Sequence, residues 1–275
     1  MPEGDTIFRA ARSLHAVLAG KTVTGWRSPL PGFARAELTG KRIDKVEAHG
    51  KSMMLSFDDG SAVHSHMRMT GSWHIYRPGE RWRKPGHFAR LVLETDDFVA
   101  ICFSAPVVEF LAPGRAEPHE AVTRLGPDLL KDDFDAAEAR RRLRERDATP
   151  LGEAIMIQRA LAGIGNIYKS ESLFTERLNP FLPVSAFDDA TLDALVATAR
   201  RLMMQNLDGF PRMTTRPPSM SARGPRNWVY GRRGEACLVC GARIEMRRQG
   251  MAARSTYFCP ACQGVSAGAR SGTPV

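Results

Sequence analysis

Four cysteines near the C-terminal end form the most specific chemical pattern of the sequence, Cys237-x2-Cys240-x18-Cys259-x2-Cys262. Two close pairs of thiolates are typical of tetrahedral zinc, and paired CxxC motifs without a secretion signal indicate metal ligands rather than disulfides. Because four protein ligands leave no position for water, we expect one structural Zn²⁺. The alternative is four unligated cysteines in a reduced protein.

Arginines surround these cysteines. Ten arginines and only two acids, Glu235 and Glu245, lie between Arg212 and Arg254, and the whole chain has a formal net charge of +9. A basic hairpin held by zinc can grip phosphates, which favours a nucleic acid as the partner. On these facts alone, a zinc ribbon that binds protein remains an alternative.

A turn with two glycines, Gly163-Ile164-Gly165-Asn166, joins two segments with helical patterns. Such a turn permits close approach of backbone and directs helix N-terminal amides at an anion, to which Asn166 adds side-chain donors. An ordinary connection between two helices fits the same residues equally well.

The N-terminus offers a nucleophile if Met1 is removed, because Pro2 then carries a free secondary amine. An α-amino group has a pKa of about 8, so part of it is unprotonated at neutral pH. Such an amine can attack a sugar C1′ and form an iminium, with Glu3 beside it for proton transfer. Many chains begin in this way, so the pattern gains meaning only from its context.

The elements that must position these residues follow from periodicity. Residues 5–19 form an amphipathic helix, and residues 21–112 contain short alternating runs with hairpin turns at 58–60 and 95–97. Many short strands at this spacing indicate a β-sandwich or barrel. After Pro113 the pattern becomes helical, with helices expected at 132–146, 151–162, 167–178 and 187–206, then a loop at 207–235. The expected class is therefore α+β.

Composition adds limits to this reading. The chain is 43% hydrophobic and 25% charged, as in soluble globular proteins, and no apolar run is long enough to cross a bilayer. We expect a cytoplasmic protein, associated with the nucleoid if DNA is its partner, and no membrane partner.

Five ordered segments carry a resemblance to a known family: PEGDT at 2–6, HGK at 49–51, GIGNIYKSESLF at 163–174, VYGRRGEAC at 229–237 and the four cysteines. Together they resemble the formamidopyrimidine-DNA glycosylase and endonuclease VIII family over nearly the whole chain, from Pro2 to Gln263. The resemblance implies an N-terminal helix on a β-sandwich (1–114), a helix–two-turn–helix DNA-binding domain (115–222) and a β-hairpin zinc finger (223–265). The small, polar composition of residues 266–275 predicts a disordered tail.

The resemblance also implies residue roles in a monomer that acts on damaged DNA. Pro2 is similar to the nucleophile that forms the Schiff base, and Glu3 to the neighbouring acid and base. Lys51 matches a lysine that holds phosphate and is assigned to β-elimination. Asn166 matches a phosphate-binding asparagine, and Arg254 a finger arginine assigned to δ-elimination. Arg124 resembles a DNA-contacting arginine of the endonuclease VIII branch.

The loop His66-Met67-Arg68-Met69-Thr70-Gly71 resembles the one that fills the gap left by a flipped nucleotide. Met69 is the expected wedge, with Arg68 facing the orphan base; by pattern alone Met69 could equally be a core residue. Lys51 could instead be a lyase nucleophile or a surface lysine. His64 and His66 share a strand face, where we expect structural roles rather than metal binding.

Four departures favour the endonuclease VIII branch with an altered preference. Thr6 replaces a frequent acid, Thr70 replaces an aromatic, the cysteine hairpin is longer, and residues 104–112 lack the arginine-phenylalanine pair of the 8-oxoguanine branch. The expected function is excision of oxidised pyrimidines through a Pro2 Schiff base and β,δ-elimination, without a redox or nucleotide cofactor. The alternatives are the same chemistry on oxidised purines, a catalytically inactive DNA-binding protein, and an unrelated enzyme with a protein-binding zinc ribbon.

Overall fold

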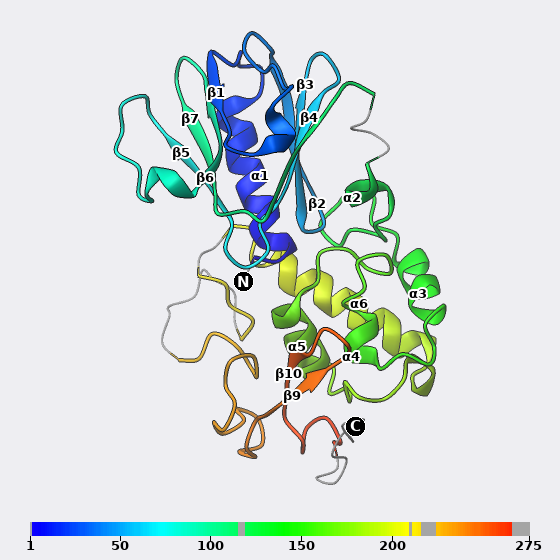
Figure 1. Cartoon of the computed structure of the whole chain (residues 1–275). Coiled ribbons are helices and arrows are strands. Elements are labelled where there is room, and N and C mark those ends of the chain that lie inside the picture. The colour runs from blue at the N-terminus through cyan, green and yellow to red at the C-terminus, as the bar shows by residue number, and fades with distance from the viewer. Residues whose placement is uncertain (1, 115–118, 209–210, 216–223, 266–275) are drawn as a thin grey trace. The chain divides into compact units, whose positions relative to one another are not determined.

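The computed structural model describes residues 2–114, 119–208, 211–215 and 224–265. The chain divides into two compact units, Met1–Leu125 and Gly126–Val275, and each is described by itself. Figure 1 shows that the first unit is built mainly of strands and the second mainly of helices.

Unit 1 is a sandwich of two antiparallel four-stranded sheets, as the spacing of short strands predicted (Figure 1). One sheet has the order β1-β6-β7-β5, made of Gly25–Arg27, Ala89–Glu94, Val99–Phe103 and Ser72–Tyr76. The other has the order β2-β3-β4-β8, made of Ile43–His49, Ser52–Phe57, Ala62–His66 and Val107–Leu111. Short helical segments complete the unit: η1 (Pro31–Phe33), η2 (Gly86–Phe88) and α2 (Glu120–Thr123).

Helix α1, Gly4–Leu18, confirms the amphipathic helix expected at 5–19. Ile7, Leu14 and Leu18 are almost fully buried and join the apolar core of the sandwich. Burying a large aliphatic side chain contributes about 1.5–3 kcal/mol, so this face anchors the helix firmly. The carbonyl of Glu3 accepts from the N–H groups of Thr6 and Ile7 at 2.9 and 3.1 Å. The chain is therefore held from its third residue onward.

Both expected hairpin turns are present, one between β3 and β4 and one between β6 and β7. A third hairpin joins β2 to β3 through Gly50 and Lys51, with His49 opposite Ser52. Gly50 has a φ of 56°, a left-handed conformation that glycine adopts without strain. Ser52 in turn pairs with His66, so Lys51 and the segment after His66 leave the sheet at the same end.

Unit 2 contains the helices α3 (Ala136–Arg144), α4 (Leu151–Ala154), α5 (Asn166–Thr175) and α6 (Asp189–Met204) and the short η3 (Val184–Ala186). Asp135 caps α3 by accepting from Glu138 N at 3.0 Å, and Asp188 caps α6 by accepting from Thr191 N at 2.8 Å. These caps explain why both helices start later than the acidic runs before them suggested.

The helix expected at 151–162 is wrong beyond its first turn, because α4 ends at Ala154. The backbone that follows pairs with another segment: Gly126 N donates to Gln158 O at 2.8 Å and Ala162 N donates to Pro127 O at 3.0 Å. The Gln158 side chain also accepts from Gly163 N at 3.1 Å. Separate turns and bonds to the distant residues 126 and 127 therefore replace the continuous helix that the apolar pattern predicted.

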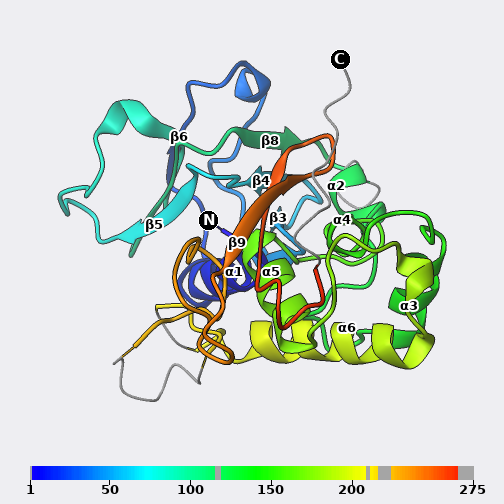
Figure 2. The same cartoon turned by 90° about the horizontal axis from the view of Figure 1, so that it is seen from below.

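The last two strands, β9 (Glu245–Gln249) and β10 (Arg254–Phe258), form an antiparallel hairpin that packs on α5 (Figure 2). Buried polar bonds fasten it there. Lys169 Nζ donates to Thr256 Oγ1 at 2.8 Å, and Thr256 Oγ1 donates to Gln249 Oε1 at 2.8 Å. Residues 207–208, 211–215 and 224–235 contain no helix or strand, in agreement with the expected loop, and the tail 266–275 lies outside the described residues.

The turn at Gly71 yields a prediction, because a Cβ there would lie 2.7 Å from Met67 Cα and 2.9 Å from Ala105 Cα. Gly71→Ala should lower the free energy of unfolding by about 1–3 kcal/mol, since backbone atoms must move. Gly32→Ala is the matched control, because no atom lies within 4 Å of its added Cβ. Equal denaturation midpoints for the two variants would contradict this account of the turn.

Candidate functional site

Two acidic side chains lie at the start of α1, next to the N-terminal residue. Pro2 is half-buried, whereas Glu3 and Asp5 are fully buried. Thr6 Oγ1 donates to Asp5 Oδ1 at 3.4 Å, so the residue that departs from the family pattern contacts a buried acid. The sequence pattern singled out Glu3 but not Asp5. Glu3 and Asp5, the neighbours of Gly4 in the chain, thus each contribute a buried carboxyl group next to Pro2.

Lys51 and the loop after β4 occupy one end of the sheet β2-β3-β4-β8. Burial, together with the positive charges of Arg68 and Lys51, lowers the pKa of His66 to about 4. Arg68 N donates to His66 Nδ1 at 3.1 Å, which requires a ring without a proton on that atom. Lys51 and Arg68 therefore form a basic cluster at this end, beside the neutral ring of His66.

The loop 67–71 presents Met69 to solvent. Its side chain is 67% exposed, whereas Met67 is 3% exposed and belongs to the core, so the core position is occupied by Met67 and not by Met69. Arg68 has a φ of 45°, a strained value for a residue with a side chain. Thr70 Oγ1 donates to Ser104 O at 2.9 Å and ties the loop to the β7–β8 connection. The exposed methionine is therefore held on a short, fixed turn.

Arg124 lies at the C-terminal end of α2 and forms an ion pair with Glu120 one turn earlier. Both side chains are largely exposed, so this pair contributes little to stability and can be exchanged for another anion.

Asn166 is the first residue of α5 and is 9% exposed. Its Oδ1 atom is buried without a hydrogen-bond partner in the described part of the chain. The two ends of an amide exchange by a half-turn, so the same position can present a donor. A buried amide at the positive end of a ten-residue helix is suited to an anionic ligand.

Arg254 is exposed at the start of β10 and lines a pocket of about 240 Å³ within unit 2. Lys169 and Glu153 also line this pocket. The other hairpin arginines are engaged: Arg247 pairs with Glu245 at 3.1 Å, and Arg248 Nη1 donates to Ala253 O at 2.9 Å. Arg254 is therefore better placed than its neighbours to contact a phosphate.

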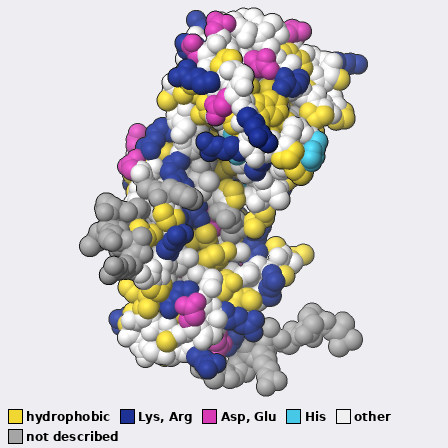
Figure 3. Space-filling model, turned by 90° about the vertical axis from the view of Figure 1, so that its left-hand side faces the viewer, with side chains coloured by type: hydrophobic (Ala, Val, Ile, Leu, Met, Phe, Trp, Pro, Cys, Tyr) yellow, Lys and Arg dark blue, Asp and Glu magenta, His cyan; other side chains and the backbone are white. Residues whose placement is uncertain are grey.

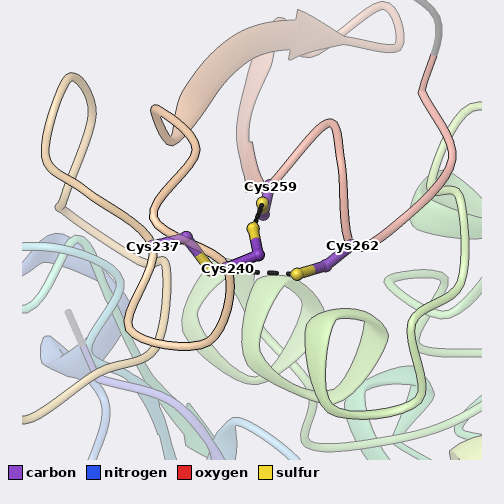
Figure 4. A group of neighbouring side chains, drawn as sticks. All are labelled: Cys237, Cys240, Cys259 and Cys262. Atoms are coloured by element: carbon purple, nitrogen blue, oxygen red, sulfur yellow. Dashed lines mark hydrogen bonds between the residues drawn. The ribbon is translucent and has the colours of Figure 1, made fainter.

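The four cysteines point toward one another (Figure 4). The Sγ atoms of Cys237 and Cys262 are 3.9 Å apart, and those of Cys240 and Cys259 are 3.4 Å apart. Zinc–sulfur bonds of about 2.3 Å in a tetrahedron place sulfurs about 3.8 Å apart, so the set fits zinc without rearrangement. Hydrogen bonds, first from the backbone of Ala242 and then from the other cysteines, lower the pKa of the Cys240 thiol to about 7, toward the thiolate that binds metal.

A buried glutamate that sequence reasoning overlooked organises the approach to this finger. Glu171 on α5 is fully buried and accepts from the N–H groups of Trp228, Val229 and Tyr230 at 2.7–2.9 Å. Burial raises its pKa, and these hydrogen bonds oppose the rise. The Thr214 hydroxyl donates to the same carboxylate. Glu171 therefore holds two segments, around 214 and 228–230, against one helix.

Basic side chains also gather on the loop between β5 and η2, which carries Arg77, Arg81, Arg83 and Lys84 against one acid, Glu80. Figure 3 shows Lys and Arg side chains around hydrophobic ones on the upper part of its face, which unit 1 forms.

Within the described residues, no helix has the length and apolar character required to cross a membrane.

Three family models match the chain in order. The formamidopyrimidine-DNA glycosylase N-terminal domain matches residues 1–106, its H2TH domain matches 125–215, and a zinc finger found in FPG and IleRS matches 234–265. A Streptomyces coelicolor protein named probable endonuclease 8 2 is 41% identical over 266 residues, which cover 96% of this chain and 94% of that protein. The chain belongs to the formamidopyrimidine-DNA glycosylase and endonuclease VIII family.

Further comparisons define its place in this family. The Mycolicibacterium smegmatis protein named DNA-(apurinic or apyrimidinic site) lyase Nei2 is 38% identical, with 97% of this chain and 100% of that protein covered. These relatives confirm the expected endonuclease VIII branch. Lactococcus lactis formamidopyrimidine-DNA glycosylase, solved non-covalently bound to DNA with an abasic site, has a TM-score of 0.78 at 23% identity and covers 95% of this chain and 99% of its own. That likeness confirms the fold, and the four-cysteine cluster with the zinc-finger model confirms one structural zinc.

The lowered pKa of His66 predicts that the stability of the folded protein depends on pH. At pH values between 6.5, the ordinary pKa of histidine, and about 4, His66 is protonated in the unfolded chain but not in the folded one. The stability that neutral His66 contributes is thus present above pH 6.5 and lost as the pH falls toward 4.

His66→Gln should therefore lose less free energy of unfolding than the wild type between pH 7 and pH 4.5, measured by denaturant titration. His87→Gln, at an exposed position, is the control and should follow the wild type. Parallel curves for all three proteins would rule out His66 as a source of the acid sensitivity.

Proposed function

We propose that the protein is a bifunctional DNA glycosylase and abasic-site lyase of base excision repair that removes oxidised pyrimidines. The observation that carries the proposal is the start of α1, where Pro2 stands beside the fully buried Glu3 in a chain of this family. The helix fixes the position of the N-terminal amine, and burial places a carboxyl group next to it.

In the proposed reaction, Met1 is removed and the Pro2 nitrogen attacks C1′ of the damaged nucleotide. The N–C1′ bond forms as the glycosidic bond breaks, the base leaves with a proton, and the sugar ring opens to an iminium. Glu3 transfers protons during base loss and ring opening. The iminium acidifies the 2′ hydrogen, so β-elimination breaks the 3′ phosphate bond and δ-elimination the 5′ one. Water then releases the enzyme amine.

Three basic or amide groups are proposed to hold the DNA backbone: Lys51, Asn166 and Arg254. The unpaired buried amide oxygen position of Asn166 at the start of α5 supports phosphate binding there. The exposure of Arg254 and its place on the finger hairpin support its role in δ-elimination. Arg124 is proposed as a further contact, because its pair with Glu120 is exposed. Each such contact adds to affinity and to salt dependence.

Met69 is proposed to enter the space left by the flipped nucleotide, because it is 67% exposed on a turn anchored by Gly71 and Thr70. An apolar side chain inserted between bases offsets part of the cost of unstacking, which is a few kcal/mol. Arg68 lies on the same turn, one residue before Met69, and is proposed to face the orphan base.

The preference for pyrimidines is supported by the connection between β7 and β8, which consists only of Ser104, Ala105 and Pro106. It carries no arginine-phenylalanine pair, and Ser104 O already accepts from Thr70.

A single chain supplies the nucleophile, the acid and the phosphate contacts, so the proposal needs only a monomer. Because its proposed substrate is DNA, we propose that the protein acts at the nucleoid in the cytoplasm.

Cleavage of matched duplexes tests the substrate class. The wild type should nick a strand with 5-hydroxyuracil or dihydrouracil at least tenfold faster than one with 8-oxoguanine. The reverse order would support the oxidised-purine activity instead. Binding without cleavage of any lesion or abasic site would favour an inactive DNA-binding protein.

Arg254→Ala should reduce the δ-elimination product at an abasic site by about tenfold or more, because a charge-assisted hydrogen bond contributes about 1.5–3 kcal/mol. The β-elimination product should persist. Arg243→Ala removes an equally exposed finger arginine and is the control. Gel separation of the two 3′ ends gives the ratio, and equal losses in both variants would assign Arg254 only a general electrostatic role.

A further inference from the structure

Two histidines and one glutamate meet in unit 1, outside the residues assigned to DNA or to catalysis. His64 on β4 and Glu109 on β8 are directly opposite in the antiparallel register. His119 precedes α2 and brings a third ligand-type side chain to the same place. One ligand atom from each residue lies within 4.8 Å of the other two.

The distances between these atoms are close to those of a metal centre. His64 Nδ1 is 2.8 Å from Glu109 Oε2, and His119 Nε2 is 3.7 Å from the same oxygen. The two imidazole rings have centroids 4.9 Å apart. Zinc bonds of about 2.0–2.2 Å to nitrogen and oxygen place tetrahedral ligands about 3.3 Å apart. Shifts of about half an ångström would therefore bring each histidine nitrogen to such spacing from the carboxylate oxygen, and the two nitrogens lie within 4.8 Å of each other.

The surroundings of His64 suit a ligand. Its Nε2 atom is 3.1 Å from Ser52 Oγ, so the proton can reside on Nε2 and be accepted by the hydroxyl while Nδ1 faces Glu109. The ring is 4% exposed, and burial lowers its pKa, which favours the neutral form.

His119 must give up a bond to take part. Its Nδ1 atom accepts from Ala121 N at 3.3 Å, which places the ring proton on Nε2. A metal on Nε2 would move that proton to Nδ1 and release the cap of α2. This contact is long for a hydrogen bond, so a metal–nitrogen bond is a favourable exchange.

We propose that His64, Glu109 and His119 bind a divalent first-row transition-metal ion, which in the cell is zinc. Imidazole and carboxylate ligands are typical of zinc, nickel and cobalt rather than of calcium or magnesium. The Glu109 side chain is 51% exposed, so solvent can supply a fourth ligand. The ion would join β4, β8 and the segment that enters α2, the last helix of unit 1.

Metal stoichiometry of the purified full-length protein tests the proposal. With the finger zinc retained, the protein is dialysed against micromolar Zn²⁺ and its metal content measured by mass spectrometry. Two ions per chain are expected for the wild type. His119→Gln, which changes a half-buried side chain, and Glu109→Gln should each bind one.

His87→Gln serves as the matched control and should still bind two ions. Cobalt added to the zinc protein should give the weak absorption of a nitrogen and oxygen site, without the sulfur charge-transfer bands of the finger. One ion per chain in the wild type, or a second ion that persists in both His119→Gln and Glu109→Gln, would overturn the proposal.

Discussion

A reactive chain terminus must be held still, although termini are ordinarily the least ordered part of a polypeptide. Here the third residue already belongs to the cap of α1, and its carbonyl accepts the first two helical bonds. The helix is fixed in turn by Ile7, Leu14 and Leu18, which are buried in the sandwich core. The position of Pro2 thus depends on apolar packing along fifteen residues of helix. If that packing failed, Pro2, the proposed nucleophile, would lose its fixed position beside Glu3.

The second unit solves a similar problem with buried polar groups. A zinc finger has little core of its own, so its hairpin needs a scaffold. Helix α5 provides one through Lys169, which bonds to Thr256, and through Glu171, which binds three successive amides. Leaving any of these groups unpaired costs about 1–3 kcal/mol, so the helix that begins with Asn166 also determines where Arg254 lies.

Local patterns predicted the elements whose bonds are local. The amphipathic face of α1, the glycine and aspartate turns of the hairpins and the cysteine spacing each describe contacts between residues close in sequence. The prediction of a helix over 151–162 failed because the segment forms separate turns, and its backbone also pairs with the distant residues 126 and 127. Likewise, the sequence could not reveal that Met67 rather than Met69 is buried, since that choice depends on how the loop crosses the sheet end.

Side chains that act through distant partners were also beyond the sequence. Glu171 lies within a recognised motif, yet its partners are 43 to 59 residues away, and no spacing rule connects them. His64 and Glu109 pair only because β4 and β8 are neighbours in one sheet. The three strands between them in sequence, β5, β6 and β7, belong to the other sheet. The expectation of structural roles for His64 and His66 rested on strand alternation, which places side chains on a face but does not identify their partners.

The central claim is that the N-terminal amine of Pro2 is the nucleophile, and borohydride trapping tests it most directly. The protein is incubated with duplex DNA that carries an abasic site, reduced, and examined for a covalent adduct. Wild type and Lys51→Ala should both be trapped, whereas a form that retains Met1 should not, because its Pro2 nitrogen is an amide. An adduct with the Met1-retaining form, lost in Lys51→Ala, would assign the attack to lysine and contradict the account.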